Sequence, residues 1–347
     1  MCLSLLVCFA FAGCKGDEDT VSSTPKNTSS KTETAESKEE TSSKQETSRP
    51  AEIIPVDTYG DLLKKMKESG KQLAFYGKWA TDGSADGTDA AELTNALNSY
   101  RHKISFVAYS IKNDRAVCYN TESDAFCACT VKAAYVLYAL KEMEKAQINP
   151  DETYLTYEKK HHETGTGDMQ YSPYGTKFTI RTTVEKTMSI SDNVGYMMLV
   201  DRFGRDGYNK WISALGCESL QIKPTVWALH AKSHDLAVVW REIYNYFKQK
   251  ENNIYSKLLY DCTTNTANGY AAAALKDVDY SHKQGNNRGG DWHSYSDAGI
   301  VWRENEPYII SVITDAPGPS DYDAQMMAKI ITYVDKKITE QNNIDIP

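Results

Sequence analysis

The chain has 347 residues, of which 41% are hydrophobic and 25% are charged, so it is long enough for one large globular domain plus further segments. Its net charge is -8 and its pI is near 5.5, and Lys and Arg are interspersed with acidic residues. Phosphate binding needs clustered basic residues, so nucleic acid is not an expected partner.

Residues 1–14 are a short apolar run that ends in Phe11-Ala12-Gly13-Cys14. Small residues directly before a cysteine resemble the cleavage site of a lipoprotein signal peptide, which would leave Cys14 as the lipidated first residue of the mature chain. An ordinary cleaved signal peptide and a buried N-terminal strand are the alternatives. The run is too short to span a bilayer as a helix. We expect an exported lipoprotein of the cell membrane that faces the extracytoplasmic side.

Residues 15–50 are almost entirely polar and show no apolar periodicity. They bury too little surface to offset the entropy of ordering, so we interpret them as a disordered linker that holds a folded domain clear of the membrane.

Residues 51–88 are an accessory N-terminal segment with a short helix predicted at 57–70 and a possible strand at 73–79. The Asp- and Gly-rich run at 82–87 lacks the closing glutamate of a calcium loop and is interpreted as a helix-capping loop.

Apolar patterning from residue 89 predicts a helix, two strands, a long helical insertion, three strands and a final helix. We therefore expect an α/β (α+β) domain at 89–340, with a five-stranded antiparallel sheet flanked by N- and C-terminal helices. An inserted all-helical subdomain is expected at about 121–278, and the cleft between the two lobes is a natural active site. The predicted strands are 104–111, 115–119, 280–286, 294–303 and 307–315, and the predicted helices include 89–101, 182–203, 206–215, 233–250, 254–263 and 321–339, with another that opens at Cys129.

The cysteines outside the proposed leader and lipid site are odd in number, which leaves at least one free thiol unless chains pair with each other. Disulfides are permitted in an extracytoplasmic protein, but the spacing does not assign them. A bridge between Cys127 and Cys129 is sterically unfavourable on a turn that enters a helix. These cysteines are Cys118, Cys127, Cys129, Cys217 and Cys262.

Three short motifs follow one another in the 89–340 region. Cys129 stands three residues before Lys132 at the start of an apolar helix, and Ser191-Asp192-Asn193 and Lys283-Gln284-Gly285 lie downstream. Positions i and i+3 share one face of a helix, so the Lys132 amine can reach Cys129. A free cysteine is often just a small core residue. A helix N-terminus and a neighbouring cation both lower the pKa of a thiol, however, and here they favour a reactive cysteine.

These motifs resemble the Ser-x-x-Lys, Ser-Asp-Asn and Lys-Thr-Gly motifs of class A β-lactamases and penicillin-binding proteins, with Cys129 in place of the serine and Gln284 in place of the threonine. The resemblance covers about residues 89–340, and its most specific blocks are 179–204 and 282–315. It implies a covalent acyl-enzyme formed with a β-lactam or an acyl-D-Ala-D-Ala-like amide, such as the stem peptide of peptidoglycan. No cofactor and no metal is expected.

The resemblance assigns the chemical steps to three side chains. Cys129 would be the nucleophile, and Lys132 would be its base or the positive partner of its thiolate. Ser191 would relay a proton to the leaving amide nitrogen, between Lys132 and Lys283. Asp192 would hold the turn together from within.

The resemblance also implies a set of substrate-binding residues. Asn193 would hydrogen-bond the amide side chain of the substrate, and Lys283 would attract its carboxylate. Gln284 replaces a threonine that also binds this carboxylate, which changes the expected affinity and specificity. Gly285 would allow close backbone approach, and the backbone N–H groups of Cys129 and Asn286 would form an oxyanion hole.

One departure from the family pattern concerns hydrolysis of the acyl-enzyme. Class A β-lactamases carry a Glu and an Asn on an omega loop, which position the hydrolytic water. Here the region 217–235 has no Glu-x-x-Leu-Asn, and Glu218 comes too early in the block. We therefore expect weak or slow deacylation. The alternative is a catalytically degenerate cell-surface protein that binds cell-wall peptide or another partner, although the intact lysine, serine and asparagine positions favour an enzyme.

Overall fold

The computed structural model describes residues 66–67, 70–71, 73–77, 88–112, 115–223, 230–264, 269–275, 278–290, 292–304, 307–318 and 320–340. Cys14, the predicted linker, most of the predicted helix at 57–70 and the loop at 82–87 lie outside these residues. All described residues belong to one compact unit, which spans Ile54–Pro347. Within the described stretches, no helix is long and apolar enough to cross a membrane.

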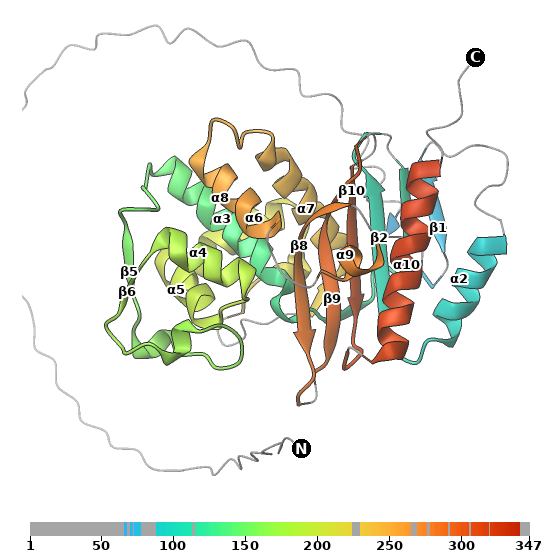
Figure 1. Ribbon diagram of the computed structural model, residues 1–347, viewed down its shortest axis with the longest axis horizontal. Helices are drawn as coiled ribbons and strands as arrows, with labels where there is room; N and C mark the ends of the chain where they lie inside the picture. Colours follow the sequence, from blue (N-terminus) through green and yellow to red (C-terminus); the bar gives the residue numbers. More distant parts are fainter. Residues whose placement is uncertain are drawn as a thin grey trace, which may run out of the picture. The chain divides into compact units, whose positions relative to one another are not determined.

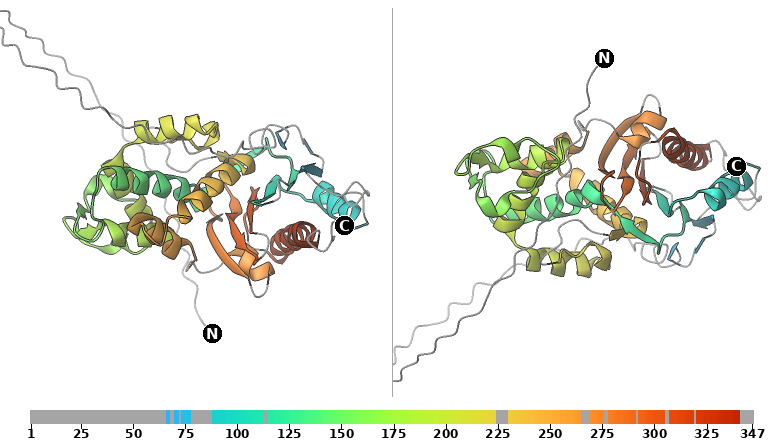
Figure 2. Two further views of the ribbon diagram at one scale, coloured as in Figure 1. Left: turned by 90° about the horizontal axis from the view of Figure 1, so that it is seen from above. Right: turned by 90° about the horizontal axis from the view of Figure 1, so that it is seen from below.

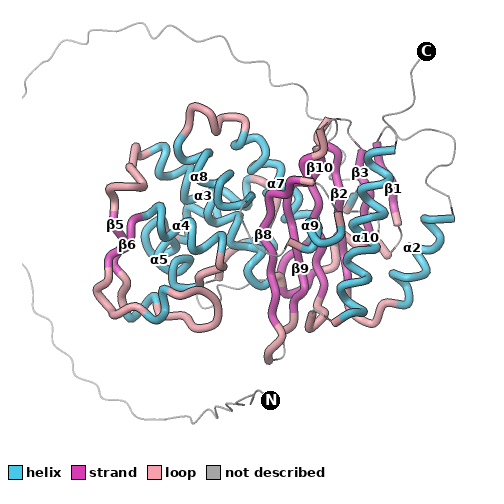
Figure 3. The backbone as a smooth tube through the Cα atoms, in the orientation of Figure 1, coloured by secondary structure: helices cyan, strands magenta, loops and turns pink. Residues whose placement is uncertain are grey.

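Within the described residues, an antiparallel sheet of six strands forms the centre of this unit, in the order β1-β3-β2-β10-β9-β8 (Figures 1 and 3). The predicted antiparallel sheet is confirmed, but it has one strand more than the five expected. The additional strand is β1, which pairs with β3 at the edge and lies in the segment given as a possible strand. The strands are β1 (Ala74–Gly77), β2 (Ile104–Ser110), β3 (Arg115–Tyr119), β8 (Asp279–Asn287), β9 (Ser294–Trp302) and β10 (Tyr308–Thr314).

Helices cover both faces of the sheet. Because side chains alternate along a strand, Phe106 and Val107 of β2 enter different hydrophobic cores. Phe106 shares its core with α2 (Thr88–Ser99) and α10 (Asp321–Glu340), and the short helix α9 (Tyr270–Ala274) packs against α10 on this same side (Figures 1 and 2). The other face packs against α7 (Ser233–Phe247). The terminal helices and the insertion therefore enclose the sheet, as the sequence predicted.

The inserted part of the chain is mainly helical but contains short strands that were not predicted. β4 (Asp124–Phe126) pairs with β7 (His230–Lys232), and β5 (Tyr154–Thr156) pairs with β6 (Lys177–Thr179). The single helix predicted at 182–203 is also wrong in one respect, because two helices with a turn between them occupy this stretch. Besides α7, the helices of the insertion are α3 (Lys132–Lys145), α4 (Ile180–Ser189), α5 (Asn193–Phe203), α6 (Arg205–Ala214), α8 (Ile254–Thr264) and α9 (Tyr270–Ala274), together with short 3-10 turns.

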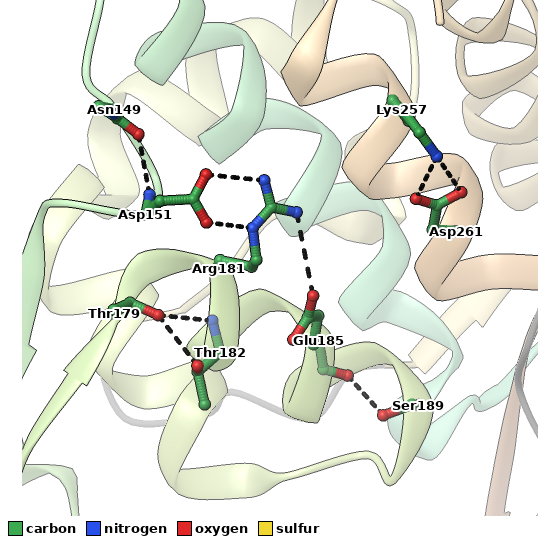
Figure 4. A network of polar contacts seen from close by, with 9 residues as sticks. All are labelled: Asn149, Asp151, Thr179, Arg181, Thr182, Glu185, Ser189, Lys257 and Asp261. Carbon is green, nitrogen blue, oxygen red and sulfur yellow. Dashed lines mark hydrogen bonds and ion pairs between the residues drawn. The ribbon is translucent and has the colours of Figure 1, made fainter.

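A polar network fixes the start of α4 (Figure 4). The guanidinium of Arg181 donates twice to the carboxylate of Asp151, with the Nη2 to Oδ2 distance at 3.0 Å, and lies 3.9 Å from Glu185. Thr179 caps the helix, since its Oγ1 accepts from the backbone N–H of Thr182 at 3.1 Å. Such a cap stabilises a helix by about 1 kcal/mol. The network orients the helix whose far end leads into the Ser191 turn.

Candidate active site

Cys129 lies in η2 (Ala128–Val131), a short 3-10 turn that continues into the buried helix α3. Ala128, directly before it, has a φ of 45°, in the left-handed region. A residue other than glycine is strained there by roughly 1–3 kcal/mol and keeps such a conformation only where its surroundings fix it. The thiol residue is 8% exposed. The strained turn therefore holds Cys129 at the mouth of α3 with little access to solvent.

The turn that carries Cys129 packs directly on strand β8 at Gly285. A Cβ atom at position 285 would lie 2.1 Å from the carbonyl oxygen of Cys127 and 2.4 Å from Oγ1 of Thr130. Only glycine permits this contact. The close approach predicted for Gly285 is thus made by the chain segment that carries Cys129, which brings Asn286, the next residue along β8, to the same end of the site.

Lys132 joins the first motif to the second. Its side chain is fully buried, and its ammonium donates to the carbonyl oxygen of Ser191 at 2.5 Å and to Oδ1 of Asn193 at 2.6 Å. Nζ also lies 5.9 Å from the ring centre of Tyr196. Burial lowers the pKa of Lys132, and the nearby Cys129 opposes this effect. The lysine therefore links the helix that follows Cys129 to both Ser191 and Asn193 of the second motif.

Lys283 joins the third motif to the second. It is 2% exposed, and its ammonium donates to the hydroxyl of Ser191 and to the carbonyl oxygen of Gln284 at 3.1 Å. Burial lowers the pKa of Lys283 to about 8, against the opposing influence of Cys129. Ser191 has a φ of 57°, and this conformation directs its carbonyl to one lysine and its hydroxyl to the other.

A loop at residues 163–169, here called the site loop, is attached to the second motif. The buried carboxylate of Asp192 caps α5 and also accepts from the backbone N–H of Met169 at 2.9 Å. The side chain of Asn193 donates to the carbonyl oxygen of Thr164 at 2.7 Å. Asp192 thus works from inside the turn, as the sequence predicted, and it also holds the site loop in place.

Electrostatics favour ionisation of the Cys129 thiol. Burial raises its pKa, but the charges of Lys132 and Lys283, and hydrogen bonds to the sulfur, outweigh burial, so the pKa lies below the usual value for cysteine. Burial has the opposite outcome at Cys217 and Cys262, where it raises the pKa. All five described cysteines are free thiols, which leaves Cys129 available as a nucleophile.

Comparison with known proteins identifies the family of the chain. The model of the β-lactamase enzyme family matches residues 89–338, which is most of the chain. The chain belongs to the β-lactamase enzyme family. A search of curated protein sequences gave no match.

Several solved structures share the fold of this β-lactamase-family chain. A mutant of PBP-A, described as an acyl-enzyme complex with penicillin G, is 18% identical, with a TM-score of 0.61 over 72% of this chain and 96% of that one. A β-lactamase from Sphaerobacter thermophilus is 16% identical, with a TM-score of 0.62 over 74% and 97%. A class A β-lactamase from Bacteroides cellulosilyticus is 17% identical, with a TM-score of 0.60 over 73% and 97%. At these identities the likeness establishes the fold.

Sequence reasoning missed one residue of this β-lactamase-family site, Thr166. Its Oγ1 lies 4.0 Å from Sγ of Cys129, 3.2 Å from Oδ1 of Asn193, and donates to the carbonyl oxygen of Ser191 at 2.5 Å. Thr166 belongs to none of the three motifs. The sequence signal was the glycine on each side of it, and both Gly165 and Gly167 adopt positive φ.

The structure gathers most of the predicted site residues into one cluster. Gln284 is half-buried and contributes its backbone carbonyl to Lys283, while Asn286 is exposed on the same strand. Of the described part of 217–235, Glu218 opens a short 3-10 turn and Asp235 accepts from the hydroxyl of Ser219 at 2.6 Å. The clustered residues are Cys129, Lys132, Ser191, Asn193, Lys283 and Gly285.

Proposed function

We propose that this protein is an acyl-transfer enzyme that uses Cys129 as its nucleophile and releases the acyl group slowly. One observation carries the proposal, namely the placement of a thiol with a lowered pKa beside two buried, hydrogen-bonded lysines. A nucleophile next to a positioned cation or base is the arrangement that covalent catalysis requires. Family membership supports the reaction class, and the role of Cys129 as the nucleophile is the part that we propose for this chain.

Acylation follows from the contacts of Ser191. The Cys129 thiolate attacks the carbonyl carbon of the substrate amide, so a C–S bond forms as the C–N bond breaks. The departing nitrogen takes the proton of the Ser191 hydroxyl, and the Lys283 ammonium that is hydrogen-bonded to this hydroxyl replaces the proton. Lys132 stays protonated and balances the thiolate charge until the bond has formed.

Substrates with a carboxylate next to the reactive amide suit this site. Lys283 supplies a positive charge inside a buried strand, where attraction is stronger than in water. β-Lactams and the stem peptides of peptidoglycan both carry such a carboxylate. The acyl-enzyme complex of PBP-A with penicillin G, a protein of the same fold, supports the β-lactam as one substrate class.

Slow deacylation follows from what the sequence lacks. Hydrolysis of the thioester needs a base that activates water, and the segment 217–235 has no Glu-x-x-Leu-Asn to supply it. The acyl group therefore stays on Cys129. The alternative function is binding of cell-wall peptide without turnover, which the replacement of the motif threonine by Gln284 favours.

We also propose that the protein is a lipoprotein that faces the extracytoplasmic side. The apolar run that ends at Cys14 and the polar residues 15–50 support a lipidated N-terminus followed by a spacer. Metabolic labelling with a radioactive fatty acid should mark the wild-type protein and leave Cys14→Ser unlabelled. Equal labelling of both would contradict the anchor.

A chromogenic cephalosporin tests acyl transfer and slow release together. Mixing it with enzyme should give a rapid colour change of about one equivalent per protein, followed by a much slower steady rate, which is the fingerprint of an accumulating acyl-enzyme. Cys129→Ala is the control and should lack the rapid phase. Fast continuous turnover would contradict slow deacylation, and no rapid phase in the wild type would favour the binding function.

A further inference from the structure

Thr166 lies outside the three motifs, and its side chain contacts the sulfur of Cys129. We propose that it is a positioning residue for the thiolate, whose hydroxyl hydrogen turns from the Ser191 carbonyl to Sγ when the thiol loses its proton. The inference rests on the proposed nucleophilic role of Cys129. It gives the site loop a role in stabilising the thiolate, which none of the three motifs indicates.

The hydrogen-bonding capacity of a threonine hydroxyl permits this exchange. It has one hydrogen to donate and two lone pairs to accept with. In the structure the hydrogen goes to the carbonyl oxygen of Ser191 at 2.5 Å, and Oγ1 can accept from the thiol 4.0 Å away. A thiolate has no hydrogen and acts purely as an acceptor. Ionisation of Cys129 therefore favours rotation of the Thr166 hydroxyl toward the sulfur.

The two oxygens near Thr166 keep a partner when its hydroxyl turns. Lys132 donates to the Ser191 carbonyl at 2.5 Å and to Oδ1 of Asn193 at 2.6 Å, the same two oxygens that lie within 3.2 Å of Thr166. The rotation therefore leaves no carbonyl oxygen unpaired. It exchanges a neutral hydrogen bond for a charge-assisted one, which is stronger.

The backbone of the site loop fixes the position of the hydroxyl. The carbonyl oxygen of Thr166 accepts from the backbone N–H of Asn193 at 3.1 Å. Gly165 and Gly167 have φ of 114° and 92°, and a Cβ at position 167 would lie 2.1 Å from the carboxylate of Asp192. The loop therefore lies tight against the second motif. A group held in this way stabilises a charge without reorganising.

Charged groups from several elements influence the ionisation of the Cys129 thiol, directly or through the two lysines. Lys132 of α3 and Lys283 of β8 act on Cys129 directly. Asp192, at the N-cap of α5, and Glu163 of the site loop act on Lys132, while Asp297 of β9 acts on Lys283. A substitution at position 166 that removes a neutral hydroxyl leaves all of these charges in place. A change in the ionisation of the Cys129 thiol can then be attributed to loss of the Thr166 hydroxyl.

The test is the pH dependence of alkylation of Cys129 by iodoacetamide in the full chain, with the modified site identified by peptide mass. Thr166→Val should raise the midpoint of this profile by about one pH unit, because a hydrogen bond to a charged group is lost. Thr166→Ser keeps the hydroxyl and should stay near the wild type. Thr164→Val is the matched control, because Thr164 accepts from the side chain of Asn193 through its backbone carbonyl, which the substitution leaves in place.

Two results would overturn the inference. One is a Thr166→Val profile that superimposes on the wild type, and the other is an equal shift in Thr164→Val. Thr166→Ala serves in the same way if the valine variant does not fold, as judged by circular dichroism. Iodoacetamide needs no substrate site, so the outcome is separate from the proposed function. If Thr166→Val shifts the midpoint but β-lactams do not acylate the wild-type protein, the positioning role of Thr166 stands and the proposed acyl-transfer function is wrong.

Discussion

Ser191 is the residue on which the three motifs converge. Its carbonyl accepts from Lys132 and its hydroxyl accepts from Lys283, so both lysines are held by one residue. Ser191 and Ala128 both adopt positive φ, at 57° and 45°. Each costs roughly 1–3 kcal/mol, and strain of this kind concentrates where surrounding contacts fix a functional geometry. Ser191 itself is proposed to transfer the proton, and Ala128 directly precedes Cys129, which is proposed to form the acyl bond.

The pH dependence of acylation should show the lowered pKa of Lys283. Its usual pKa is 10.5 and here it is about 8, so the ammonium loses its proton as the pH rises through 8. Acylation of Cys129 by a carboxylate-bearing penicillin should therefore fall above about pH 8, because a neutral amine no longer attracts the carboxylate. Alkylation by uncharged iodoacetamide is the control and should not fall. Parallel profiles for the two reagents would contradict the role of Lys283.

At the scale of elements, the second motif joins α5 to the site loop through one buried carboxylate. Asp192 accepts from the backbone N–H of Gly195 at 2.8 Å, inside the helix, and from that of Met169 at 2.9 Å, at the end of the loop. Both N–H groups are buried and have no access to solvent. The position of the site loop therefore depends on the N-terminus of a helix.

Asp192→Ala should lower the free energy of unfolding by about 2–4 kcal/mol, because a helix cap is lost and a buried N–H is left unpaired. Urea denaturation followed by circular dichroism measures this change. Asp168→Ala is the matched control from the same loop. Its partner is Lys186 at 2.7 Å in an exposed ion pair, and the expected loss is below about 1 kcal/mol. Equal losses in the two variants would show that Asp192 does not connect the elements.

Strands and helices with a regular spacing of apolar residues were predictable from the sequence. Very short strands, and contacts between residues far apart in the sequence, were not. The strands of the sheet and helix α10 follow from apolar alternation and helical spacing. β4 to β7 are each three residues long, which is too short for a periodic signal. The break between α4 and α5 depends on the positive φ of Ser191, and the approach of Thr166 to Cys129 joins residues 37 positions apart. Local patterns carry neither of these features.

At the scale of the whole unit, residues before the family domain belong to its core. Met66 is fully buried in the hydrophobic core that contains α3, and its carbonyl oxygen accepts from the hydroxyl of Thr121 at 2.7 Å. The backbone N–H of Asn120 donates to the carbonyl oxygen of Gly70 at 2.7 Å. With β1 at the sheet edge, these contacts make part of the predicted accessory segment a component of the fold.

Met66→Ala should lower the free energy of unfolding by about 2–5 kcal/mol, as expected for a fully buried methionine. Ile254→Ala is the control, because Ile254 is 52% exposed and the expected change is within about 0.5 kcal/mol. A chain that begins at residue 88 should lose more stability than either variant, relative to one that begins at residue 54. Equal unfolding midpoints for the two shortened chains would contradict a structural role for this segment.

The mass of the intact protein after incubation with benzylpenicillin tests the central proposal, that Cys129 still forms an acyl-enzyme. We predict a shift of one drug mass that persists for many minutes, maps to the peptide containing Cys129 and is absent in Cys129→Ala. Measurement under reducing and non-reducing conditions separates a thioester from a disulfide adduct. An unmodified wild-type protein, with Cys129→Ser also unmodified, would contradict the nucleophilic role of this position.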